Sequence, residues 1–122
     1  MAAAYLAVQG VGGLAWWVLL IAVPAARRPF VTAGAPEATL MAFVGADLLL
    51  YVGGSLTAAY GLARRRSWAW PVLCIHAGAA AYASLYVVTL TAWTGSAAAG
   101  AVLMAPSMVI PLGLCWWLRP GR

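Results

Sequence analysis

Two side chains that could carry proton or ligand chemistry lie inside long apolar stretches of this chain. Asp47 falls within the stretch 38–62, and His76 falls within the stretch 70–93. A charged side chain placed in lipid hydrocarbon costs roughly 2.5–3.5 kcal/mol on insertion scales, so by default such a residue is a candidate functional residue. We therefore expect Asp47 to be the centre of any activity of this protein.

Helical spacing places further polar groups near these two residues. Asp47, Tyr51 and Ser55 are spaced at i, i+4 and i+8, so they share one helix face. At a rise of about 1.5 Å per residue, Asp47 and His76 differ in depth by roughly 13 Å, and a direct ion pair between them is not expected. If the polar faces of the two helices oppose each other, a polar track runs from Gln9 and His76 to Asp47 and Ser107, bridged by tyrosine hydroxyls and water.

The residues expected along this track form two groups. The predicted ligand or proton centre consists of Asp47, Tyr51, Ser84, Tyr86 and Ser107. The predicted secondary polar cluster consists of Gln9, Ser55 and His76. Trp16 and Trp17 either line a cavity for an apolar ligand or belong to an outer aromatic belt at the membrane surface.

Both titratable residues also have a purely structural interpretation. Asp47 could be a neutral carboxyl group that is hydrogen-bonded to a neighbouring serine, tyrosine or amide, but asparagine or serine would do that job at lower cost. His76 could be a neutral imidazole bound to Ser55 or to a backbone carbonyl. We favour a functional role for Asp47 and leave both interpretations open for His76.

The composition is that of a membrane protein. Of 122 residues, 66% are hydrophobic and only 7% are charged, whereas a soluble domain carries about 25% charged residues. The net charge of +5 comes from arginines, which lie in short clusters between apolar runs and at the chain end. Such clusters set membrane orientation and meet lipid head groups, so the lipid bilayer is the expected partner and nucleic acid is not.

The predicted fold is an all-α integral membrane protein, a four-helix transmembrane bundle with antiparallel up-down topology and short loops. A helix needs about 20 apolar residues to cross the bilayer core. The chain has room for four such helices, and its apolar runs lack the alternation of a barrel strand. We predict a single membrane domain, 1–122, with spans at about 3–23, 38–62, 70–93 and 97–118.

The arginines predict the orientation of the four spans. One side of the membrane receives both chain ends and the cationic turn 63–67, and so holds Arg64, Arg65, Arg66, Arg119 and Arg122. The other side receives only Arg27 and Arg28, opposed by Glu37. Cytoplasmic loops carry the excess of arginine, so both termini are predicted to be cytoplasmic in a multi-pass protein of the cell (inner) membrane.

The two cysteines, Cys74 and Cys115, form no CxxC motif. Both are expected toward the cytoplasmic ends of their helices, where thiols stay reduced, and we interpret them as small buried hydrophobic residues. Cys74 and His76 are two residues apart and face nearly opposite ways on a helix, so they are poor partners in a metal site. We expect neither a metal nor a cofactor.

Three functions agree with these features. The favoured one is binding or translocation of a small ligand or proton through the Asp47 centre, with a homodimer expected because four short helices enclose little volume. The second is a non-catalytic subunit or assembly partner of a larger membrane complex, which predicts a glycine stripe facing lipid or a partner and a sealed interior. The third is a membrane enzyme or sensor that binds an apolar metabolite between helices, in a closed pocket lined by Trp16, Trp17 and Tyr86 with Asp47 at its base. As an enzyme it would act on an apolar, isoprenoid-like lipid by acid–base chemistry, with Asp47 as proton donor and Tyr86 or His76 as partner. This last alternative leaves enzymatic activity undecided.

Overall fold

The protein is described from a computed structural model, in which residues 1–32, 34 and 36–121 are placed. Its helical segments, in chain order, are α1 (Ala2–Ala22), the 3-10 helix η1 (Pro24–Phe30), α2 (Glu37–Met41), α3 (Phe43–Ala46), the π-helix η2 (Asp47–Gly53), α4 (Gly54–Ala63), α5 (Ala69–Thr94) and α6 (Ala98–Trp117).

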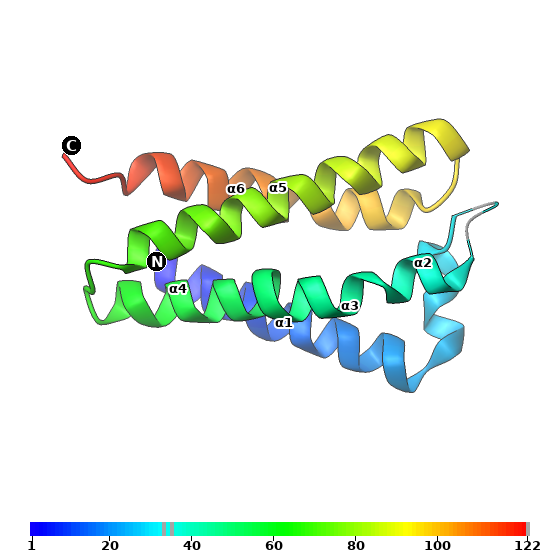
Figure 1. The fold of residues 1–122 in the computed structure, drawn as a ribbon, viewed down its shortest axis with the longest axis horizontal. Helices are drawn as coiled ribbons and strands as arrows, with labels where there is room; N and C mark the ends of the chain where they lie inside the picture. The colour runs from blue at the N-terminus through cyan, green and yellow to red at the C-terminus, as the bar shows by residue number, and fades with distance from the viewer. Residues whose placement is uncertain (33, 35, 122) are drawn as a thin grey trace.

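Four helical spans are long and apolar enough to cross a membrane, namely Ala2–Ala22, Glu37–Ala63, Ala69–Thr94 and Ala98–Trp117. Figure 1 shows that they run alternately up and down, with both chain ends and the α4–α5 turn at the same end of the molecule. The predicted all-helical, antiparallel four-helix bundle is therefore confirmed. Each boundary lies within one residue of the predicted one, because the hydrophobic runs stop where arginine, proline or glycine appears.

The second span is less regular than a single predicted helix. It consists of α2, α3, η2 and α4, which follow one another with little interruption, and η2 begins at Asp47 itself. Gly45 lies two residues before η2, Gly53 is its last residue and Gly54 follows it, and glycine is a poor former of α-helix. A π-helical turn rotates the side chains that follow it relative to those of an α-helix, and such turns are frequent at functional sites.

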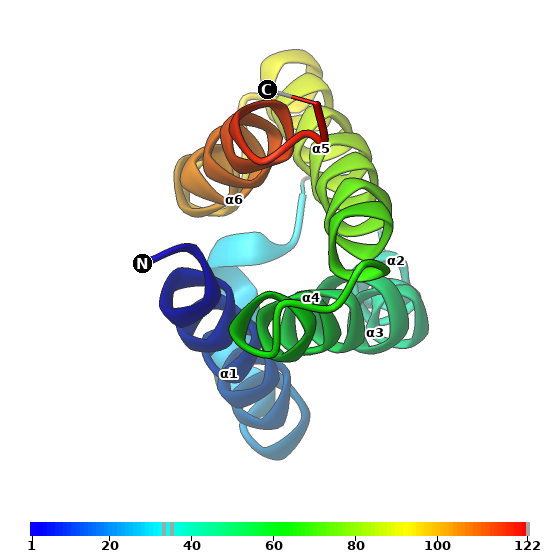
Figure 2. The ribbon, with the colours of Figure 1, turned by 90° about the vertical axis from the view of Figure 1, so that its left-hand side faces the viewer.

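The four spans form an arc rather than a closed ring. Along the arc, α1 packs on α4, α4 on α5, and α5 on α6, whereas α1 and α6 touch only lightly. Figure 2 shows α1 and α6 as the two ends of this arc, with η1 behind the space between them. The side of the bundle between α1 and α6 is therefore not covered by a helix.

The half of the bundle near the chain ends is tightly packed. Its core consists of Leu6, Ala58, Ala59 and Leu73. Gly61 allows α4 to approach the start of α5, because a Cβ at Gly61 would come within 2.8 Å of the Ala69 Cβ and closer still to the Trp68 ring. Small residues at such contacts let transmembrane helices approach closely. This half therefore has a sealed interior.

At the opposite end, Arg27 holds the first loop in place. Its Nε donates to the carbonyl of Leu20 at 2.6 Å, its Nη2 donates to that of Ile21 at 3.3 Å, and its Nη1 forms an ion pair with Glu37. A cation at the C-terminus of α1 and a carboxylate in the first turn of α2 both complement the helix dipoles. Because Arg27 bridges α1 and α2, it holds η1 across this end of the bundle.

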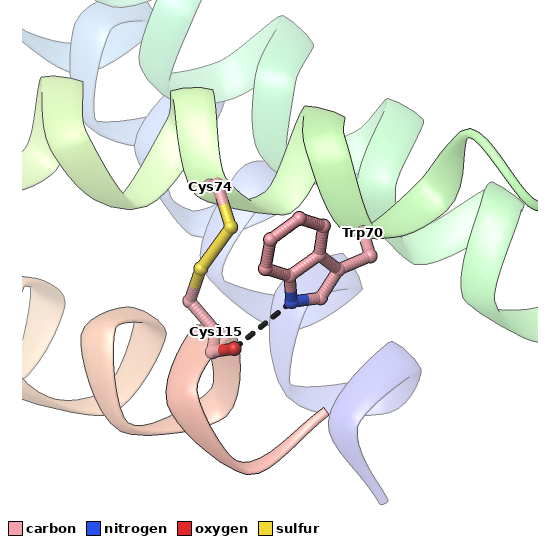
Figure 3. The surroundings of a disulfide bond; sticks show 3 residues. All are labelled: Trp70, Cys74 and Cys115. Atoms are coloured by element: carbon pink, nitrogen blue, oxygen red, sulfur yellow. Dashed lines mark hydrogen bonds between the residues drawn. A yellow bond between two sulfur atoms is a disulfide. The ribbon is translucent and has the colours of Figure 1, made fainter. Parts of the chain in front are cut away.

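The prediction for the two cysteines is wrong, because Cys74 and Cys115 form a disulfide. Their Cα atoms are 5.6 Å apart although they are separated by 41 positions in the sequence. Cys74 lies near the start of α5 and Cys115 near the end of α6, so the antiparallel pair brings them to the same level. Beside the disulfide, the Trp70 indole Nε1 donates to the Cys115 carbonyl at 2.9 Å (Figure 3).

We predict that the purified protein, denatured without reductant, does not react with a maleimide-linked polymer, and that reduction exposes two reactive thiols. The disulfide restricts the unfolded chain, so its loss should lower the free energy of unfolding by up to about 4 kcal/mol. The measurement is the gel shift on maleimide labelling, followed by thermal unfolding with and without reductant.

The matched control for this experiment is the double variant Cys74→Ser/Cys115→Ser. Reductant should leave the unfolding temperature of this variant unchanged. Two reactive thiols in the unreduced protein would contradict the disulfide.

Candidate functional site

The other half of the bundle holds a cavity of about 450 Å³, within the size range of small-molecule sites in proteins. Its walls come from α1, η1, the second span, α5 and α6, and most of the lining is apolar. Seven residues of the two predicted clusters and the aromatic pair line it: Gln9, Trp16, Trp17, Asp47, Tyr51, Tyr86 and Ser107. The cavity thus gathers most of the predicted site residues.

Asp47 is held in this cavity by one specific donor. The Trp17 indole Nε1 donates to Asp47 Oδ2 at 3.2 Å, and Trp17 is only 3% exposed. Oδ1 of the same carboxyl group has no hydrogen-bond partner among the described residues, although the group lines the cavity. One oxygen of the carboxyl group is therefore bound by the protein, and the other can accept a hydrogen bond from a ligand.

A chain of three hydrogen-bonded side chains in the cavity links three of the four spans. Gln9 Nε2 of α1 donates to the Tyr51 hydroxyl at 2.9 Å, and that hydroxyl donates to Ser107 Oγ of α6 at 2.7 Å. Gly13 makes room for the Tyr51 ring, because a Cβ at Gly13 would lie 3.0 Å from it. The Gln9 Oε1 atom is buried and has no hydrogen-bond partner among the described residues.

Aromatic rings form much of the remaining wall. The Trp16 ring meets the Phe30 ring edge to face, with centroids 4.2 Å apart. The Phe43 and Tyr86 rings lie 5.3 Å apart on another side of the cavity. Of the two interpretations of Trp16 and Trp17, the structure favours the cavity wall over the outer belt, because both residues line the cavity.

The two predicted serines Ser84 and Ser55 do not line the cavity. Ser84 Oγ donates to the Met104 carbonyl at 3.1 Å, and Ser55 Oγ donates to the Leu6 carbonyl at 2.7 Å. Both side chains therefore join neighbouring helices through a backbone carbonyl, as small hydroxyl residues often do in membranes.

His76 is fully buried between α4 and α5 and also lies outside the cavity lining. Its Nδ1 is 3.4 Å from the Leu50 carbonyl of η2, which accepts only, so the hydrogen-bond network assigns the proton to Nδ1. Nε2 is then an acceptor, and it has no partner among the described residues. Gln9, Ser55 and His76 are not hydrogen-bonded to one another, so the predicted secondary cluster is not assembled as a single site.

The cavity opens on the side where the arc of helices is incomplete. Val8 of α1 and Leu103 of α6 both line it, and their side chains are 73% and 59% exposed. Because α1 and α6 touch only lightly, this mouth lies on the lateral face of the bundle. In a bilayer, such a face meets the lipid chains.

Two features of the site were missed by the sequence analysis. Phe30 and Phe43 belong to the wall, but Phe30 is in a loop that only the fold brings over the cavity. Gln9 was placed with His76, whereas it binds Tyr51. The i, i+4 spacing of Gln9, Gly13 and Trp17 was a usable signal, since it puts one polar side chain and one indole donor on a single face of α1.

The chemistry available in the cavity is hydrogen bonding and apolar contact. Within the part of the chain that the structure describes, no group of three or more metal-binding side chains is found. The cavity instead combines a carboxyl group, an amide, hydroxyls and aromatic rings, which suits recognition of a molecule with one polar end and an apolar body.

No protein-family model matches this chain, and neither a curated protein nor a solved structure matches it.

We predict that Tyr51→Phe destabilises the bundle by about 1–2 kcal/mol, because two interhelical hydrogen bonds are lost and each contributes about 0.6 kcal/mol on average in membranes. The measurement is unfolding in mixed lipid–detergent micelles. Tyr82→Phe is the matched control, because Tyr82 lies on α5 and is 72% exposed. Equal stability of the two variants would contradict the assigned network.

Proposed function

We propose that this protein binds a small molecule with an apolar body and one polar end, taken from the bilayer into the cavity around Asp47. The observation that carries the proposal is the cavity itself. Its aromatic and aliphatic walls suit an apolar body. Asp47 lines the cavity with only Oδ2 in a described hydrogen bond, and Gln9 Oε1 is buried without a partner among the described residues. A buried acceptor without a partner is costly, so a bound donor would stabilise the site.

Binding is better supported than passage across the membrane. Between the cavity and the chain ends, the core of Leu6, Ala58, Ala59 and Leu73 closes the bundle. At the other end, η1 and the Arg27–Glu37 ion pair lie across it. The lateral mouth between α1 and α6 is then the entrance, and it leads from the lipid rather than from water.

The two alternatives fit the cavity less well. A non-catalytic subunit was expected to have a glycine stripe facing lipid or a partner and a sealed interior, but the cavity leaves the interior of one half open. An acid–base enzyme needs a partner for Asp47, and His76 does not line the cavity. Tyr86 does line it and stays the one candidate partner that the sequence analysis named. Because the cavity is built within one chain, ligand binding does not require the expected homodimer or larger complex.

We further propose that the protein lies in the inner membrane with both termini in the cytoplasm, from the arginine excess at that end. Arg122, which belongs to that count, is outside the described residues. The Cys74–Cys115 disulfide argues the other way, because cytosolic thiols are kept reduced. We retain the arginine-based orientation because positive charge acts during insertion, before α5 and α6 have packed and brought the two thiols together.

The cavity proposal is tested by filling the cavity. A Cβ at Gly12 would meet no atom within 4 Å, and Gly12 lines the cavity. We expect Gly12→Phe to weaken saturable binding of 4-phenylbutanol at least about tenfold, a loss of about 1.4 kcal/mol. Binding is measured by calorimetry in zwitterionic lipid nanodiscs, after subtraction of the heat from empty nanodiscs.

Gly78→Phe is the matched control, because Gly78 also has open space around it but is not a lining residue. It should bind the probe like the wild type. The proposal fails if the wild type shows no saturable binding, or if Gly12→Phe binds as well as Gly78→Phe.

The orientation is tested with single cysteines at the two ends of the bundle. In intact cells, a membrane-impermeant maleimide should label Ala25→Cys in η1. It should label Ser67→Cys, in the arginine-rich turn, only after lysis, because that turn is proposed to be cytoplasmic. The reverse pattern would show that the disulfide, and not the arginines, indicates the compartment.

A further inference from the structure

We infer that the cavity selects ligands whose polar end is cationic and donates hydrogen bonds, such as an ammonium group on an apolar body. This inference rests on the proposed function and names the class of molecule that the site prefers. It depends on three features of the cavity: the charge of its lining, the hydrogen-bonding atoms left free, and the aromatic walls.

The first feature is charge. Among the described residues that line the cavity, Asp47 is the only one whose side chain can be anionic, and no arginine lines it. Of the two arginines in η1, Arg27 is held by Glu37 and by two carbonyls of α1, and neither Arg27 nor Arg28 lines the cavity. A carboxylate in a low-dielectric site without a cationic partner is destabilising, and a bound cation would offset that cost.

The second feature is the set of free hydrogen-bonding atoms. The Trp17 indole is already used by Asp47, and the Gln9 amide and the Tyr51 hydroxyl donate within the protein. Gln9 Oε1 is a buried acceptor without a partner among the described residues. The hydrogen bond described for Asp47 uses Oδ2, which leaves Oδ1 as a second acceptor. An ammonium group has three donors and no acceptor, so it matches this set. Ser107 accepts a hydrogen bond from Tyr51, so its own hydroxyl proton can still be donated to a ligand. An alcohol oxygen can accept this proton, and an alcohol can therefore also bind, but more weakly than an ammonium group.

The third feature is the aromatic wall. The Trp16–Phe30 and Phe43–Tyr86 pairs stand around the same cavity as Asp47. Aromatic faces attract cations, and the attraction grows when the site is dry. The same rings also pack against an apolar body. They therefore favour a cationic amphiphile and give no advantage to an anionic one.

The test compares three probes that share one body: 4-phenylbutylamine, 4-phenylbutanol and 4-phenylbutyrate. Calorimetry is done on the wild type in zwitterionic nanodiscs, so that lipid charge does not concentrate any probe. The amine should bind about tenfold more tightly than the alcohol, because a hydrogen bond to a charged group contributes about 1.5–3 kcal/mol. The carboxylate should show no saturable binding.

The variant Asp47→Asn should reduce the ratio of amine to alcohol affinity to about one. This comparison, like that in the wild type, uses a ratio within one protein and does not depend on the absolute affinity of the variant. Should Asp47→Asn fail to fold, the wild-type ranking of the three probes decides the question without it.

The outcomes separate this inference from the proposed function. If the alcohol binds and Gly12→Phe abolishes its binding, the cavity is a ligand site. The selectivity for cations is then overturned if the amine binds no more tightly than the alcohol, or if the amine keeps its advantage in Asp47→Asn. If no probe binds the wild type saturably, the proposed function and this inference both fail.

Discussion

A carboxyl group inside a lipid-facing bundle must be held by the protein, and the hydrogen bond from Trp17 to Asp47 does this here. The indole holds one oxygen at 3.2 Å and leaves the other facing the cavity. The Gln9–Tyr51–Ser107 chain fixes the neighbouring polar floor across three spans. The Trp17 indole and the Tyr51 hydroxyl are engaged as donors, whereas Gln9 Oε1 is an acceptor without a partner among the described residues.

The bundle divides into two halves with different tasks. Near the chain ends, the helices are held tightly together by small residues, by the core of Leu6, Ala58, Ala59 and Leu73, and by the Cys74–Cys115 disulfide. In the other half, the helices of the arc are held apart, with η1 lying across the end and α1 and α6 leaving a lateral mouth. The closely packed half supports the half that holds the cavity. It can therefore fix the geometry of the cavity without filling it.

The predicted site residues discussed here fall into two groups: those that line the cavity, and those whose hydroxyl group binds a backbone carbonyl of a neighbouring helix. Asp47, Tyr51, Ser107 and the two tryptophans come together because they lie on faces that converge inside the arc. Ser55 and Ser84 were predicted for the polar track, but each satisfies its hydroxyl on a backbone carbonyl of the next helix. Sequence alone cannot distinguish these outcomes, since a serine on an inward face can bind either a backbone carbonyl or a ligand.

Hydrophobicity by itself determined the four spans, their alternating direction and the position of Asp47 within the second span, because membrane insertion depends on the length and charge of each segment. Only the tertiary structure decided that α1 and α6 stay apart, that Phe30 folds over the cavity, that Gln9 binds Tyr51 rather than His76, and that the two cysteines meet. These features depend on the rotation and spacing of helices relative to one another. The sequence of a nearly uniformly apolar helix says little about which of its faces turns toward the other helices. The reason is that lipid chains are as apolar as the protein interior, so neither face is preferred.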